Sequence, residues 1–143
     1  MGFDIYQRSA IIYDEGTEQF TGTTLEGIGQ AVVGVMQHPA DSANRFMKVR
    51  SIKTCQNELL VNFQQATGQE WKVTRSTTKD LKASGEAKFK DGIPGWTLEL
   101  AVTQLLDKGK GRGIVASSRE ESDSEILGVL EESPLGVVIK GLK

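Results

Sequence analysis

The fold of this 143-residue chain is decided by residues 43–73, which read ANRFMKVRSIKTCQNELLVNFQQATGQEWKV. The run RFMKVR at 45–50 alternates apolar and basic side chains, which is the period of a half-buried β-strand. An apolar stripe at helical spacing follows over 55–66, and the run WKVTR at 71–75 alternates again. Strand, helix and strand in about 30 residues predict a right-handed βαβ unit over 45–75 with two parallel strands.

Two further elements are expected before this unit. Residues 8–21 contain a β-branched run, the turn Asp14-Glu15-Gly16 and a second short run, which together predict a β-hairpin. A helix then begins at Thr23, which stands three residues before Glu26 at capping-box spacing, and it ends before Pro39. Its apolar stripe comprises Leu25, Ile28, Val32, Val35 and Met36, and its glycines allow close backbone packing.

The second half of the chain is less regular until its end. Residues 79–120 form a variable region that contains an apolar helix at 96–106. The closing helix over 134–142 has the clearest signals, because Ser133 is a good N-cap and Pro134 suits the first helical position. Its apolar residues recur at i, i+3, i+4 and i+7, namely Leu135, Val138, Ile139 and Leu142. Earlier in the chain, Gly68 stands where a helix from 55 would end.

Composition excludes several classes of protein. The length fits one domain or a piece of a larger one. Seventeen basic and 19 acidic residues give a net charge of −2, spread evenly along the chain, so no nucleic-acid partner is expected. No apolar run approaches the roughly 20 residues of a membrane span. The single Cys55 excludes an intramolecular disulfide and a multi-cysteine zinc site, and no metal site is expected. A reducing, cytoplasmic location follows as the expectation.

In this order the elements resemble the C-terminal part of NmrA-like, isoflavone-reductase-like proteins, especially their fungal branch. These are atypical short-chain dehydrogenases. The resemblance is carried by residues 9–39 and 43–73, including the helix start Thr54-x-x-Asn57-Glu58, and by SEILGV at 124–129 with the closing helix. It implies an α/β fold class, the C-terminal portion of an NAD(P)-binding Rossmann-type NmrA-like fold, and NADP(H) as the cofactor of a full-length member.

The chain departs from the family at its beginning. Family members start with a strand and a G-x-x-G-x-x-G loop that holds the cofactor pyrophosphate, and this chain has no such motif. The catalytic lysine of the reductase members belongs to the same missing part. We therefore nominate no catalytic and no cofactor-binding residue, and expect a truncated oxidoreductase that is inactive alone and binds no NADP(H). The alternative is a dinucleotide-sensing regulatory or protein-binding module without turnover, and a third reading is a truncated gene product.

The resemblance also places a substrate pocket. Within the family the variable region 79–120 shapes the pocket or its lid, so Phe89, Trp96 and Leu100 are the candidate pocket residues for a small apolar or aromatic substrate. Ordinary core packing is the alternative role for these side chains. Because the missing half would supply sheet and helix partners, we also expect the isolated chain to self-associate through uncovered apolar faces.

Other motifs carry weaker signals. The run GKGRG at 109–113 offers two cations to a phosphate, but it lacks Walker spacing and follows a helix, which favours a solvated loop or a lid. His38 has no nucleophile or carboxylate partner that the sequence reveals. Cys55, in a first helical turn, is interpreted as structural. The acidic run 120–123 lacks the spacing of a calcium loop.

Overall fold

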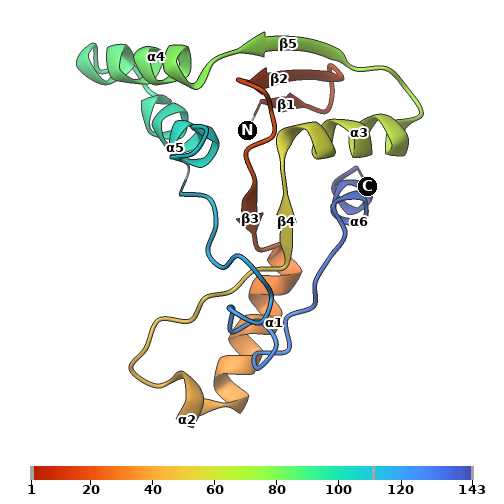
Figure 1. Cartoon of the computed structure of the whole chain (residues 1–143), viewed down its shortest axis with the longest axis vertical. Helices are drawn as coiled ribbons and strands as arrows, with labels where there is room; N and C mark the ends of the chain where they lie inside the picture. Colours follow the sequence, from red (N-terminus) through yellow and green to blue (C-terminus); the bar gives the residue numbers. More distant parts are fainter. Residues whose placement is uncertain (1, 111, 143) are drawn as a thin grey trace.

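The computed structural model describes residues 2–110 and 112–142, and it confirms a mixed α/β fold of two small sheets surrounded by helices (Figure 1). The strands are β1 (Phe3–Asp4), β2 (Ser9–Tyr13), β3 (Phe20–Gly22), β4 (Ile52–Thr54) and β5 (Lys72–Ser76). The helices are α1 (Leu25–Gln37), α2 (Pro39–Ser42), α3 (Gln56–Thr67), α4 (Thr78–Lys90), α5 (Trp96–Leu106) and α6 (Pro134–Gly141).

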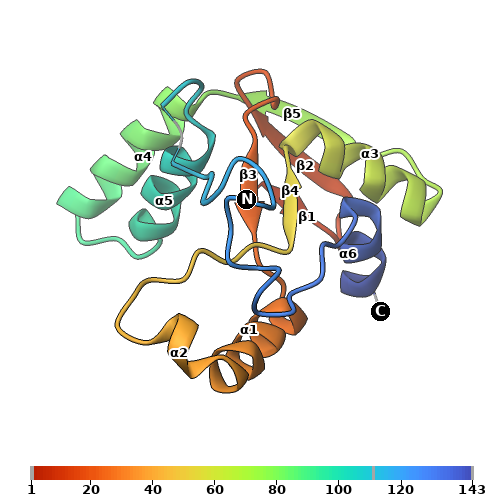
Figure 2. The same ribbon diagram turned by 60° about the horizontal axis from the view of Figure 1, so that its bottom comes forward.

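Pairing divides the strands into two sheets. The first has the order β1-β2-β5, with β1 antiparallel to β2 and β5 parallel to β2 in a register that runs from Ser9 opposite Lys72 to Tyr13 opposite Ser76. The second consists of β3 and β4, which are antiparallel. Figures 1 and 2 show α1 and α2 at the opposite end of the molecule from β5 and α4.

The hairpin predicted over 8–21 is wrong in its position. The structure has a hairpin, but it joins β1 to β2, and β3 pairs with β4 instead of β2. The reason lies at the edge of β2 that a returning strand would use. Beyond the short β1, the Ile11 N–H donates to Gly2 O at 2.6 Å, and the Gln56 side-chain amide bonds Tyr13 N at 2.9 Å and Ile11 O at 3.1 Å. A side chain from α3 thus occupies that edge.

The βαβ unit predicted over 45–75 needs the same kind of correction. The order strand, helix, strand is present as β4, α3 and β5, but β4 begins only at Ile52 and lies in the other sheet from β5. The parallel partner of β5 is β2. The run 45–50 forms no strand, because the backbone of Lys48 and Arg50 bonds the loop at Asp123 and Ser124.

Helix boundaries follow their local signals closely. Thr24, one residue after the predicted Thr23, caps α1, since its hydroxyl accepts the Gly27 N–H at 3.1 Å. Gly68 ends α3 in the left-handed conformation with φ of +63°. Ser133 caps α6 through the Gly136 N–H at 3.1 Å, and α5 spans the residues predicted for it. No helix within the described residues is long and apolar enough to cross a membrane.

Two apolar clusters form the core. Ala10, Ile12 and Trp71 join the first sheet to α3, with the rings of Phe63 and Trp71 at a centroid distance of 4.8 Å. Phe20, Val102 and Leu106 join β3 to α5. The closing helix α6 packs on α3, and Val138 is its buried apolar residue, with an exposed fraction of 4%. Its other predicted anchors are less covered: Leu135 and Leu142 are half-buried, and Ile139 is exposed.

The apolar stripe of α1 is exposed to solvent. Leu25 and Met36 have exposed fractions of 88% and 76%. The helix touches the rest of the molecule through its small residues, because Gly27 and Gly34 are buried. A side chain at Gly34 would clash with the backbone of Leu127, because the two backbones are in close contact on this face of α1.

Candidate functional site

The three predicted pocket residues lie on the α4–α5 pair, which Figure 2 shows side by side. Phe89 of α4 and Trp96 of α5 pack edge to face with ring centroids 4.8 Å apart, and Phe89 is 60% exposed. Leu100, one turn after Trp96, lines a cavity of about 380 Å³ that also contains Lys82 and Asp107. The structure therefore joins the two aromatic rings and places Leu100 in a separate, charged cavity. Their role in substrate binding stays a prediction.

A second cavity lies where the parallel strands end, and the sequence did not indicate it. It has a volume of about 120 Å³ and is lined by Gly2, Tyr13, Leu81, Leu98, Glu99 and Val102. Tyr13 is the last residue of β2, opposite Ser76 at the end of β5. Because ligands of open parallel sheets bind beyond the carboxyl ends of the strands, this cavity is the better-placed candidate for substrate contact.

Two polar groups of this cavity have shifted pKa values. Burial and the negative charge of Glu99 raise the pKa of Tyr13, so its phenol stays protonated at neutral pH and can donate a hydrogen bond. The hydrogen bond from Lys88 lowers the pKa of Glu99, with which it forms an ion pair. The other carboxylate oxygen of Glu99, Oε2, is buried without a hydrogen-bond partner among the described residues. The Tyr13 hydroxyl thus offers a hydrogen-bond donor to a polar group on an otherwise apolar ligand.

The helix beside this cavity is fixed by Asp14. Its carboxylate accepts the Thr78 hydroxyl at 2.7 Å and the Thr78 N–H at 3.2 Å, at the start of α4. The Thr77 side chain caps the same helix by accepting the Asp80 N–H at 3.0 Å. Asp14 itself has a φ of +51°, in the left-handed region that ordinary residues avoid. The turn after β2 therefore positions α4 against Tyr13. In the sequence, the position of this contact is marked only by the turn Asp14-Glu15-Gly16, which was predicted as part of the hairpin 8–21.

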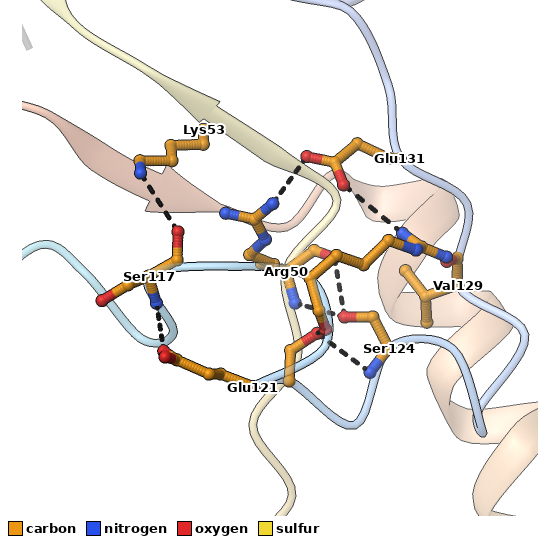
Figure 3. A network of polar contacts seen from close by, with 9 residues as sticks. Arg50, Lys53, Ser117, Glu121, Ser124, Val129 and Glu131 are labelled. Carbon is orange, nitrogen blue, oxygen red and sulfur yellow. Dashed lines mark hydrogen bonds and ion pairs between the residues drawn. The ribbon is translucent and has the colours of Figure 1, made fainter.

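A polar network around Arg50 ties β4 to the loop 114–131 (Figure 3). Arg50 is 5% exposed and its Nη2 donates to Glu131 at 2.8 Å, while Arg119 lies 3.6 Å from the same carboxylate. Lys53 donates to the Ser117 carbonyl at 3.1 Å. None of the cavities described above reaches Arg50. The network is therefore interpreted as a clamp for the loop.

The remaining motifs do not form a site. His38 is exposed and lies 3.9 Å from Asp41, and Cys55 is a half-buried N-cap of α3. In the run 109–113 the Gly109 N–H faces the Glu18 carboxylate at 3.3 Å, and residue 111 lies outside the described residues. Within the described ranges, no cluster of histidine, cysteine, aspartate and glutamate could hold a metal ion.

With the fold described, comparison with solved structures defines its class. The chain has a Rossmann-like α/β fold. It superposes on a nucleoside-diphosphate-sugar epimerase from Staphylococcus aureus with a TM-score of 0.62 and 14% sequence identity, over 94% of this chain and 44% of that one.

Among curated proteins the similarity is higher. The chain is 57% identical over all 143 residues to the oxidoreductase poxI of Penicillium oxalicum, of which it covers 46%. It is 32% identical over 82 residues to the oxidoreductase aprR of Aspergillus flavus, which is 57% of this chain and 28% of that protein. No family model matches. The chain therefore spans less than half the length of the curated relatives it matches.

Proposed function

We propose that this chain is the substrate-side part of an NADP(H)-dependent oxidoreductase of the NmrA-like, isoflavone-reductase-like kind, acting in the cytoplasm on a small apolar or aromatic substrate. The observation that carries this proposal is the 57% identity to the oxidoreductase poxI, which extends over the whole chain. The relative is about twice as long, which supports a nucleotide-binding half outside the residues of this chain.

We expect the dinucleotide to be held outside this chain. Binding a pyrophosphate in this fold needs a glycine turn between a strand and a helix N-terminus. The run 109–113 follows α5, and the N–H of Gly109 faces a carboxylate, which repels phosphate. Hydride transfer is the chemistry that the cofactor supplies when another half binds it. The contribution of this chain is to bind and orient the substrate.

Tyr13 is the side chain that we assign to this task. Its protonated phenol lines the cavity at the strand ends, where it can donate a hydrogen bond to a carbonyl or hydroxyl oxygen of the substrate. Leu81, Leu98 and Val102 supply the apolar walls. Glu99, which Lys88 holds in an ion pair, completes the polar part of the lining.

The test is a chimera in which this chain replaces the matching 46% of poxI. We expect the chimera to bind NADPH and to oxidise it in the presence of at least one member of a panel of aromatic ketones and enones. Replacing Tyr13→Phe should lower kcat/KM about tenfold or more, which is the loss of one hydrogen bond in the transition state. Tyr6→Phe is the matched control, because Tyr6 is fully exposed.

The outcomes separate the competing functions. A chimera that fails to bind NADPH contradicts the proposal. Binding of NADPH without turnover on any member of the panel favours a dinucleotide-sensing regulator. If Tyr13→Phe and Tyr6→Phe had equal effects on kcat/KM, the proposed oxidoreductase activity would stand, but the role of Tyr13 in substrate binding would not.

A further inference from the structure

The segment between α5 and α6 carries a run of serines and acids that the proposed function does not use. Residues 112–131 contain no helix or strand, and their central part reads SSREESDSE at 117–125. Four of these nine residues are serine and four are acidic. The run lies beside β4, to which the polar network around Arg50 ties it (Figure 3).

Three of the four serine hydroxyls in this run are already occupied. The hydroxyls of Ser122 and Ser124 donate to backbone carbonyls at 2.6 and 2.8 Å. The Ser118 hydroxyl bonds the Glu120 carboxylate. The Ser117 hydroxyl forms no hydrogen bond with any of residues 2–110 and 112–142, and Ser117 is exposed. Ser117 is therefore the serine of this run whose side-chain oxygen is free to react.

The backbone of Ser117 is held in place by side chains on two sides. Its N–H donates to the Glu121 carboxylate at 3.0 Å, and its carbonyl accepts the Lys53 ammonium at 3.1 Å. Figure 3 shows Glu121 on the opposite side of Ser117 from Lys53. Lys53 forms no ion pair within the described residues, so no carboxylate there neutralises its charge. A negative group attached to Ser117 would therefore find a cation beside it.

Arg50 offers further hydrogen-bond donors at the same place. It is 5% exposed, and only its Nη2 reaches Glu131, whereas its Nε and Nη1 atoms are buried without a hydrogen-bond partner among the described residues. In Figure 3 the side of this guanidinium that faces away from Glu131 is turned toward Lys53 and Ser117. Buried N–H groups are stabilised by an acceptor, and an oxyanion is the strongest acceptor for a guanidinium.

The charges in contact with this part of β4 also favour an added anion. Arg50 and Arg119 share one carboxylate, that of Glu131, at 2.8 and 3.6 Å. Lys53 adds a third positive charge, which is unpaired within residues 2–110 and 112–142. Three cations thus have one carboxylate in an ion pair with them, and an anion at Ser117 would neutralise charge here.

The residues that follow Ser117 suit a protein kinase that selects acidic substrates. Glu120 and Glu121 come three and four positions after Ser117, and both are exposed. Arg119 is the only basic residue of the sequence from 113 to 131. Because kinases select their substrates partly by charge, a kinase with basic residues beside its active site would bind this run.

We propose that Ser117 is a phosphorylation site for a kinase of this acidic-directed class, and that Lys53 and Arg50 bind the phosphate. The kinase transfers the γ-phosphoryl group of a nucleoside triphosphate to Oγ of Ser117. The bond from the γ-phosphorus to its bridging oxygen breaks, the Oγ–P bond forms, the hydroxyl proton passes to a base of the kinase, and the nucleoside diphosphate leaves. The phosphate adds negative charge and three acceptor oxygens, which fix the segment 112–131 more firmly to β4.

The first experiment uses the whole folded chain, Mg²⁺-ATP and a purified serine/threonine kinase that selects acidic substrates. We expect phosphate on Ser117, located by mass spectrometry of its peptide. Ser117→Ala should abolish this incorporation, whereas Ser118→Ala, the matched control next to it, should leave it unchanged. Phosphate on Ser118 or Ser122 instead would overturn the proposal. So would phosphorylation of a synthetic peptide of residues 112–125 without phosphorylation of the folded chain.

The second experiment asks whether Lys53 and Arg50 hold the phosphate. Nearby cations favour the dianion, so the second pKa of the phosphate, followed by ³¹P NMR, should lie about 0.5 or more below its value in the same chain unfolded in urea. Lys53→Gln should remove most of this difference. Lys72→Gln, at an exposed lysine on β5, is the control and should not. Equal pKa values in the folded and unfolded chain, or equal effects of the two substitutions, would overturn the proposal.

Discussion

Gly34 is one of the buried residues through which α1 contacts the rest of the molecule. A Cβ atom at this position would lie 2.3 Å from the carbonyl oxygen of Leu127, which is backbone and cannot turn away. Gly34→Ala should therefore lower the free energy of unfolding by about 1–3 kcal/mol, although alanine is the better helix former. Urea denaturation measures this change.

Gly29→Ala is the control on the same helix. A Cβ at Gly29 meets no atom within 4 Å, so the substitution should stabilise the protein by up to about 1 kcal/mol through helix propensity. If both substitutions changed the free energy of unfolding in the same direction, α1 would not rest on Leu127 as the structure shows.

Glu132 connects α6 to α1, and its ionisation should control stability in acid. Its carboxylate accepts hydrogen bonds from Lys140 of α6 at 2.7 Å and from the hydroxyl of Thr24, the N-cap of α1. Lys140 and then Thr24 hold the pKa of Glu132 below its usual value. A lowered pKa in the folded state contributes stability above the ordinary pKa of glutamate, and this contribution is lost as the pH falls through the folded value.

The expected result is a difference in slope. Between about pH 5 and pH 3 the wild-type chain should lose more stability than Glu132→Gln, and the two curves should converge at the acid end. The exposed residue Glu70 provides the control, since Glu70→Gln should leave the slope unchanged. Parallel curves for wild type and Glu132→Gln would show that the ion pair contributes nothing to folding.

At the level of single elements, α6 shows what local sequence signals can establish. Ser133 and Pro134 predict its start correctly, because capping depends on residues that are neighbours in the chain. Which of its apolar residues is buried depends on α3, and the sequence marked four positions equally. The structure buries Val138 and leaves Ile139 43% exposed.

Substitutions at Val138 and Ile139 give a direct test of how α6 docks. Val138→Ala should cost about 1–3 kcal/mol, since it removes buried methyl groups and leaves a cavity. Ile139→Ala should cost less than about 1 kcal/mol, as is usual for partly exposed sites. Chemical denaturation of both variants measures the difference, and a larger loss for Ile139 would mean that α6 is rotated from the position described.

At the level of the whole molecule, strand pairing was the part that the sequence could not supply. The α/β class follows from periodicity, and so do α3 with its end at Gly68 and the strand at β5. Pairing depends on contacts between distant residues, such as the Gln56 amide that occupies the edge of β2. The same holds for the cavity at Tyr13 and Glu99, whose members are 86 positions apart in the sequence and meet only because α5 packs beside β2.

The apolar stripe of α1 shows a further limit of periodicity. The sequence places its apolar residues on one side of the helix, but periodicity does not show whether that side is covered, and Leu25 and Met36 are 88% and 76% exposed.

At the same scale, we expect the isolated chain not to bind NADPH. A dinucleotide needs a strand-to-helix glycine turn and, for the 2′-phosphate, a nearby basic residue. The run 109–113 follows α5, and its Gly109 N–H faces the Glu18 carboxylate. We expect the isolated chain to show no saturable binding in a fluorescence titration, whereas the chimera with poxI binds. A dissociation constant in the micromolar range for the isolated chain, equivalent to about −8 kcal/mol, would contradict this expectation. In that case Arg112→Ala would be the next variant. Removing this cation should weaken NADPH binding if the loop 109–113 is a phosphate site, and should leave it unchanged if it is not.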